Sequence, residues 1–164
     1  MTRLPLLLCL LILHSSLCLA QTDPAPVDPT AMLRVYPESD KAISIATAFV
    51  NNLIKDSSVE SLMNLCAVPF CHDDTVIVLT RNELRTSLLE LLNASAPYRE
   101  KNHPRVDSSY VLDVRKEVLF GMVPINIYFT VVMLKFTVQG KDAAKMLILA
   151  VQISDEGKIV GIQE

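Results

Sequence analysis

The spacing of apolar residues predicts two helices in the first part of the chain. Apolar side chains recur three and four positions apart over Lys41–Lys55, which is the period of an amphipathic helix. The same spacing continues after Ser57 or Ser58, either of which can cap a second, shorter helix. Pro69 is expected to end that helix, and Cys71–Asp74 is expected to form a polar turn.

A short strand and a third helix are predicted next. β-branched residues dominate Thr75–Leu79, as they do in buried strands. Thr80 and Glu83 have the spacing of a capping box, so we expect a helix to begin there and to end near Asn93. The polar stretch Ala94–Pro104 is predicted to be a loop.

From Val106 onward the pattern changes from helical to strand-like. Apolar and polar residues alternate over Tyr110–Arg115, and β-branched and aromatic residues dominate Ile125–Val138. Turn residues precede two further predicted strands, Ala143–Ile153 and Lys158–Ile162. Helices that are gathered ahead of antiparallel strands predict an α+β fold, with three N-terminal helices packed on a mostly antiparallel sheet.

The two long strands predict a sheet with two apolar faces. If Gly140 and Lys141 form a two-residue turn, Thr130 lies opposite Val151. One face then holds Tyr128, Thr130, Val132, Leu134, Phe136, Leu147 and Leu149, and the other holds Ile127, Phe129, Val131, Met133, Met146, Ile148 and Ala150. Three helices can cover only one face, so we predict a homodimer through the other. The Pro-rich segment before Pro37, folded across that face, is the rival cover.

Residues 1–20 are typical of a secretory signal peptide. Arg3 supplies a positive charge, an apolar run follows, and Ala20 precedes a polar segment. We therefore expect cleavage near Ala20 and a secreted or periplasmic protein. The apolar run is about half the roughly 20 residues of a spanning helix, so no stable membrane anchor is expected. Residues 21–38 are predicted to be a Pro-rich linker or arm ahead of a domain at 39–164.

Charge and cysteine content narrow the class of protein further. The formal net charge is −3 and becomes −4 when Arg3 is removed, and the absence of a basic run argues against nucleic-acid binding. Cys66 and Cys71 remain after cleavage, and in an oxidising compartment we predict a disulfide between them. Two separate buried thiols are the alternative. Asn93 begins a glycosylation sequon, which matters only in a host that glycosylates secreted proteins.

The order of elements resembles the nuclear transport factor 2-like superfamily, over roughly Asp40 to Gln163. The resemblance implies a curved sheet wrapped around three helices, which together form a cone with an internal pocket. It implies a fold and no single activity, since the family includes isomerases, cyclases, dehydratases and binding proteins. The segments that carry the resemblance are Ala48–Leu53, Asp56 with Val59–Met63, Thr80–Leu84 and Asp155–Ile162.

The resemblance also implies where a ligand would bind. The residues expected to line an apolar pocket inside the cone are Phe49, Leu53, Asn126, Tyr128 and Thr130. Steroid-isomerase-like members place a catalytic carboxylate on the first strand, where this chain has Ile77 and Val78. We therefore assign no catalytic residue.

The segment Cys71–Asp74 contains residue types that bind metals. Adjacent residues cannot all point at one ion, so we expect neither a metal site nor a cofactor. These observations predict a secreted, non-catalytic domain that binds a small apolar ligand or another protein. The alternative is a small-molecule enzyme of the isomerase or cyclase type with a non-standard site.

Overall fold

The structure is a computed structural model that describes residues 36–55, 58–73, 76–117, 125–153 and 156–163. These residues belong to a unit that runs from Val35 to Glu164. The predicted signal peptide and the predicted turn at residues 121–124 lie outside the described residues. The elements in chain order are α1 (Ser39–Ile54), α2 (Val59–Leu65), β1 (Cys66–His72), β2 (Val76–Val78), α3 (Arg81–Asn102), β3 (Arg105–Glu117), β4 (Ile125–Val138), β5 (Lys141–Gln152) and β6 (Lys158–Gln163).

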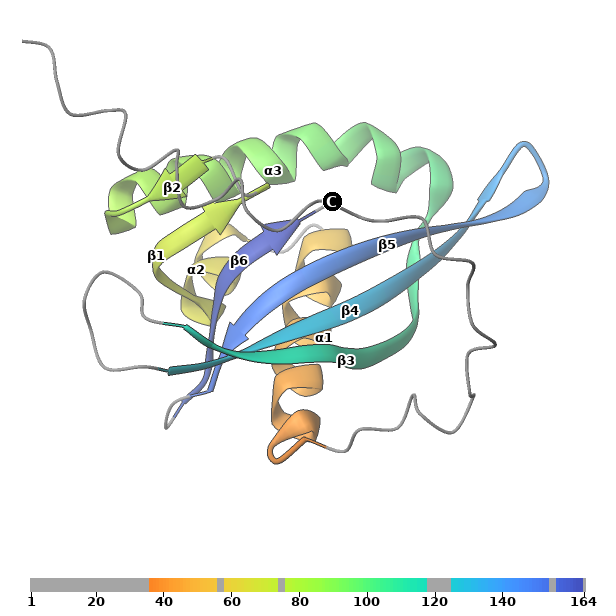
Figure 1. Cartoon of the computed structure of the whole chain (residues 1–164). Helices are drawn as coiled ribbons and strands as arrows, with labels where there is room; N and C mark the ends of the chain where they lie inside the picture. The colour runs from red at the N-terminus through yellow and green to blue at the C-terminus, as the bar shows by residue number, and fades with distance from the viewer. Residues whose placement is uncertain (1–35, 56–57, 74–75, 118–124, 154–155, 164) are drawn as a thin grey trace, which may run out of the picture. The chain divides into compact units, whose positions relative to one another are not determined.

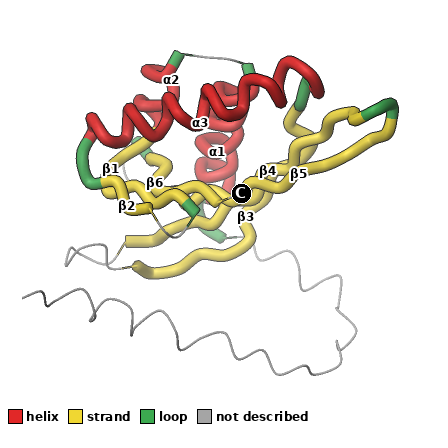
Figure 2. Tube along the Cα trace, turned by 90° about the horizontal axis from the view of Figure 1, so that it is seen from above, coloured by secondary structure: helices red, strands yellow, loops and turns green. Residues whose placement is uncertain are grey.

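The helices and strands form two layers. The six strands of the described sheet lie in the order β2-β1-β6-β5-β4-β3. The pair β1 and β6 is parallel and the other neighbours are antiparallel, so the sheet is mixed. Figure 2 shows the helices gathered on one side of the sheet. The predicted α+β class is confirmed, as is the position of the three helices ahead of most strands.

The core fills the space between the two layers. α1 contributes one face of buried side chains, among them Phe49 and Val50, as its apolar spacing predicts. The sheet contributes every second residue of its central strands, such as Val132 and Leu149, because successive side chains of a strand alternate between its faces. In Figure 1, α1 crosses the long strands β3, β4 and β5.

β1 is a strand that the sequence pattern did not predict. We expected helix and then a polar turn here, but α2 ends at Leu65 and the strand begins at once with Cys66. Ser58 caps α2 by accepting a hydrogen bond from the backbone N–H of Ser61 at 3.3 Å, as predicted for this position. Pro69 is tolerated within β1 because the pairing with β6 is interrupted there, and such irregularities need no proline N–H.

α3 continues nine residues beyond the predicted end at Asn93 and takes in most of the predicted loop. Its start is the predicted capping box, in which Thr80 and Glu83 bond each other's backbone N–H groups. The added turns are held by tertiary contacts. Arg99 is buried, and the ring of Tyr98 meets that of Phe136 edge to face at 5.0 Å.

The β4–β5 hairpin turns one residue earlier than predicted. Gln139 and Gly140 both have positive φ, of 50° and 77°, as the turn preferred in two-residue hairpins requires. Thr130 therefore lies opposite Leu149, and not Val151. The difference is two residues along β5. A shift by an even number leaves every side chain on its predicted face, so the predicted division into two faces holds.

β3 forms one edge of the sheet. Its pairing with β4 is interrupted between Val106 and Ser108 and again between Val111 and Asp113. Such bulges, together with the many polar residues of β3, disfavour further strand pairing at this edge. The described helices include none that is long and apolar enough to cross a membrane.

Candidate functional site

The predicted pocket residues lie on the helix-covered face of the sheet or near it. Phe49, Leu53, Tyr128 and Thr130 are buried in the interior, whereas Asn126 is exposed. The hydroxyl of Tyr128 donates to the carbonyl oxygen of Pro37 at 2.7 Å, so it already has a partner. None of these five residues lines either of the pockets described below. Their role as ligand contacts stays a prediction.

The opposite face of the sheet is also apolar. Among the described residues no helix lies on this side, as Figure 2 shows. Ile127, Val131 and Val160 are buried, whereas Tyr110 and Met146 are 46% and 47% exposed. Partly buried apolar side chains connect them: Phe129, Met133, Ile148 and Ala150. The name "open face" is used below for this surface of β3, β4, β5 and β6.

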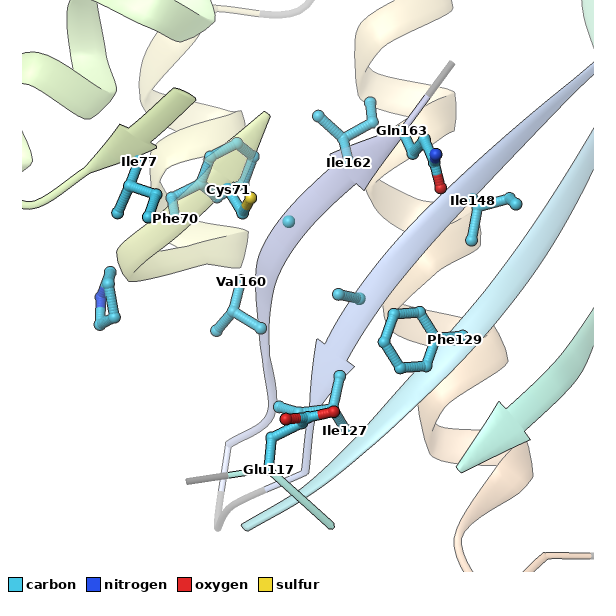
Figure 3. A pocket seen from close by; sticks show the side chains of 13 residues that line it. Phe70, Cys71, Ile77, Glu117, Ile127, Phe129, Ile148, Val160, Ile162 and Gln163 are labelled. Atoms are coloured by element: carbon cyan, nitrogen blue, oxygen red, sulfur yellow. The ribbon is translucent and has the colours of Figure 1, made fainter. Parts of the chain in front are cut away.

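A pocket of about 280 Å³ lies on the open face, lined by residues of β1 and β2 and of the central strands β4, β5 and β6. Figure 3 shows Ile77, Phe70 and Cys71 on one side of β6, and Phe129 and Ile148 on the other. The lining residues are Pro69, Phe70, Cys71, Ile77, Glu117, Ile127, Phe129, Ile148, Ala150, Val160, Gly161, Ile162 and Gln163. Sequence reasoning placed several of them on this face but took the pocket to lie on the other.

Gly161 has a packing role in the floor of this pocket. A Cβ atom added to it would lie 3.1 Å from the carbonyl oxygen of Cys71 and 3.4 Å from the Cβ of Ala150. A side chain here would therefore crowd both neighbouring strands. The glycine allows β1 and β5 to approach β6 closely and keeps the floor of the pocket low.

Polar groups are few in the pocket. Glu117 supplies the one charged side chain among the lining residues, and its carboxylate lies beside Ile127 at one end (Figure 3). The thiol of Cys71 and the amide of Gln163 are the other polar side-chain groups. The pocket is therefore an apolar surface that carries one carboxylate, one amide and one thiol.

The predicted Cys66–Cys71 disulfide does not form in the structure, where the two sulfur atoms are not bonded to each other. Cys66 is buried in the core, whereas Cys71 lines the pocket on the open face. The two side chains thus lie on opposite sides of the sheet, and the backbone between them is the irregular part of β1. Burial raises the pKa of the Cys66 thiol to about 12, and nearby Lys158 and Arg81 offset only part of that effect.

The remaining residues that the sequence singled out do not form a site together. The Nε2 atom of His72 lies 3.4 Å from a carboxylate oxygen of Asp73, but the described residues contain no group of three metal-ligating side chains. Asn93 is exposed on α3, on the helix side of the molecule, where a glycan would be clear of the open face.

A second hollow, of about 340 Å³, lies where α3 leads into β3 beside the β4–β5 hairpin. Its walls include Lys101, Arg105 and Lys135, with Asp142 as the acidic member. Arg105 and Lys135 lie directly opposite each other on β3 and β4. Among the cross-strand pairs of the described sheet, this is the only one in which both residues are charged. The name "basic hollow" is used for this site.

The structure thus defines the chain as an α+β domain, with helices on one face of a mixed sheet and an apolar pocket on the other. No family model and no curated protein matches the chain. A solved structure from Xanthomonas campestris, described as a calcium/calmodulin dependent protein kinase II association domain, is 13% identical. It aligns with a TM-score of 0.40 over 76% of this chain and 83% of its own. A score this low supports no conclusion about function or assembly.

Proposed function

We propose that the chain is a secreted, non-catalytic interaction domain, which pairs with a second copy through the open face. The single observation that supports this most is the apolar character of both faces of the sheet. The helices cover one face, whereas on the other Met146 and Tyr110 remain about half exposed beside a pocket with apolar walls. Apolar surfaces that extend beyond a few hundred Å² are uncommon on monomers.

A second copy is favoured as the occupant because the open face carries opposite charges at its two ends. Glu117 lies at one end, in the pocket, where the nearby Arg115 is already paired with Asp113 at 2.9 Å. Arg105 and Lys135 lie at the other, in the basic hollow, where Asp107 is paired with Lys135. A surface that is apolar in the centre and oppositely charged at its ends is complementary to a rotated copy of itself. In this proposal the domain has the cone-like fold of the nuclear transport factor 2-like superfamily.

The enzymatic alternative has less support from the described interior. The buried polar side chains on the helix-covered face include Tyr128 and Thr130, whose hydroxyl groups already bond carbonyl oxygens. Neither is a carboxylate or a histidine that could remove a proton from a carbon acid. A hydroxyl group that donates to a backbone carbonyl has a structural role.

A small apolar ligand in the pocket is the second candidate function. The apolar walls of the pocket favour it, and its volume of about 280 Å³, close to the lower end of the usual range for ligand sites, limits it to a small ligand. In that case the ligand, and not a second copy, would cover Ala150 and Ile148.

Native mass spectrometry of the mature protein, purified from its own source, distinguishes these functions. We expect a dimer without bound small molecules. A monomer that retains a small apolar molecule would overturn the proposal in favour of the ligand-binding function. A monomer that is soluble only with residues 21–35 present would favour the Pro-rich arm as the cover. Turnover in an isomerase screen that is lost on Tyr128→Phe would contradict the non-catalytic assignment.

A further inference from the structure

The open face has a projection and a hollow on either side of one residue of β5. Met146, Ile148 and Ala150 are spaced by two residues, so they share that face. Met146 is 47% exposed, whereas the small side chain of Ala150 forms part of the pocket wall. Ile148 lies between them and opposes Val131 of β4. The exposed side chain of Met146 and the small side chain of Ala150 are therefore equally distant along the strand from Ile148, which itself lines the pocket.

On the proposal that this face pairs two copies, we infer that the pair forms about a two-fold axis that crosses the strands at the level of Ile148. Such an axis runs the partner's β5 antiparallel to β5 across the interface. Each Ile148 then meets its own counterpart, and each Met146 lies over Ala150 of the other copy. The methionine fills the partner's pocket, because an unbranched thioether side chain adapts well to irregular hollows. The pocket is thus complete only in the pair.

The charged ends of the face fit the same axis. Glu117 opposes Ile125, which lies six residues before Val131 on β4. Thr137 lies six residues after Val131 and forms part of the basic hollow. Rotation about the axis therefore brings Glu117 of one copy toward the basic hollow of the other. Arg115, which opposes Ile127, then lies level with the other copy's Arg105, and Asp113 compensates its charge at 2.9 Å.

A partner carboxylate at the basic hollow would offset an unfavourable pairing within the chain. Like charges directly opposite each other destabilise a sheet, and Arg105 and Lys135 are so placed. Asp107 compensates Lys135 at 2.7 Å, but among the described residues Arg105 has no ion-pair partner. The carboxylate of the other copy's Glu117 would lie two strand positions, about 7 Å, from the level of Arg105, within reach of that long side chain.

The alternative two-fold axis, parallel to the strands, fits less well. It would superpose the same end of each face, so that the cations of one basic hollow would lie toward those of the other. Met146 would then lie at the same level as the partner's Met146, and neither methionine would reach a pocket. The fit of Met146 to the partner's pocket thus favours the crossing axis.

Cysteine cross-linking tests the position of the axis. The Cys71→Ser variant removes the partly exposed thiol, and Ile148→Cys or Met146→Cys is added to it. With a short bifunctional thiol reagent we expect a covalent dimer from Ile148→Cys and little from Met146→Cys. The two Met146 positions would be displaced by about 14 Å along the strands, since each residue adds about 3.4 Å. Cross-linking through Met146→Cys that equals or exceeds that through Ile148→Cys would overturn the inferred axis.

Two alanines on the open face provide a matched test of the pocket. Ala150→Leu adds bulk inside the pocket, whereas Ala144→Leu adds the same bulk on an exposed residue of β5 outside it. Overpacking of this kind costs enough to weaken the dimer about tenfold or more, so we expect the dissociation constant to rise for Ala150→Leu alone. Equal effects of the two changes would contradict the inference.

Charge reversal tests the ends of the face. Glu117→Lys and Arg105→Glu should each weaken the dimer, and the double variant should recover part of the loss. A double variant as weak as the sum of both changes would show that the two residues do not meet. If the wild-type protein is a dimer but these tests fail, the inferred axis is wrong and the proposed function stands. A wild-type monomer contradicts both.

Discussion

The guanidinium group of Arg99 donates a hydrogen bond to the carbonyl oxygen of Leu53 at 3.1 Å, and so joins α3 to the last turn of α1. The same nitrogen bonds the carbonyl oxygen of Leu92 and the hydroxyl of Ser95. Arg99 is only 8% exposed. A charged donor that satisfies carbonyl groups at the end of a helix is stabilising there, because the helix dipole is negative at that end.

Replacement of Arg99 should destabilise the fold strongly. Arg99→Met keeps most of the side-chain volume but leaves the carbonyl oxygen of Leu53 without this donor, so we expect a loss of about 2–4 kcal/mol. Arg85→Gln is the control, since its ion pair with Glu60 is exposed and should contribute less than about 1 kcal/mol. Urea unfolding of both variants measures the difference. Equal losses would refute a special role for Arg99.

The capping box of α3 should contribute measurably to stability. Thr80→Ala removes the acceptor for the N–H of Glu83, and we expect it to cost about 1 kcal/mol in thermal or urea unfolding. Ser87→Ala, in the middle of the same helix, is the control and should cost less. A loss for Ser87→Ala that equals the loss for Thr80→Ala would contradict the assigned cap.

The same cap predicts a dependence of stability on pH. Hydrogen bonds from Thr80, and then from the backbone N–H groups of Thr80 and Leu79, lower the pKa of Glu83 in the folded state. A lowered pKa means that the stabilising effect is present at neutral pH and is lost as pH falls through the folded-state value. The stability difference between wild type and Glu83→Gln should therefore shrink in acid. A difference that stays constant with pH would rule out the carboxylate as its source.

The two cysteines should differ in reactivity. Burial raises the pKa of Cys66 to about 12, so its thiolate is scarce at neutral pH, whereas Cys71 lines the pocket. A maleimide should label Cys71 alone in the folded protein, as peptide mass spectrometry can show. Labelling should also slow as the protein concentration rises, because pairing covers the pocket. If neither cysteine reacts until a reductant is added, a disulfide exists after all.

Tyr128 should act as a structural anchor for the start of the domain. Tyr128→Phe removes the hydrogen bond to Pro37, with an expected loss of about 1 kcal/mol, whereas Tyr110→Phe at an exposed position should change stability little. Burial, and secondarily the charge of Glu38, raise the pKa of Tyr128. A raised pKa means that this contribution is present at neutral pH and is lost in alkali. Equal losses for the two variants would contradict the anchor.

Local signals in the sequence predict much of the fold. Apolar spacing locates α1, and caps locate α2 and the start of α3. The strict alternation of β4 and β5 assigns their side chains to the correct faces. The end of α3 could not be predicted, because the contacts of Arg99 with Leu53 and Leu92 that hold it are tertiary. β1 could not be predicted for a similar reason. A Pro-containing segment of seven residues becomes a strand only by pairing with its neighbours β2 and β6.

The candidate site was only half predictable. The open face follows from alternation, but the pocket in it depends on how β1 and β2 join the sheet beside β6. Gly161, which permits the close approach of those strands, gave no recognisable signal in the sequence. The basic hollow depends on the register of Arg105 against Lys135, which the bulges of β3 determine.

Sedimentation equilibrium of the mature protein, over nanomolar to micromolar concentrations, tests the central claim most directly. Ile148→Asp, which puts a charge at the centre of the open face, is compared with Ala144→Asp, which puts the same charge at its margin. The account predicts about twice the mass of one chain for the wild type and for Ala144→Asp, and a monomer that stays folded for Ile148→Asp. A wild-type protein that remains a monomer at micromolar concentration would contradict it.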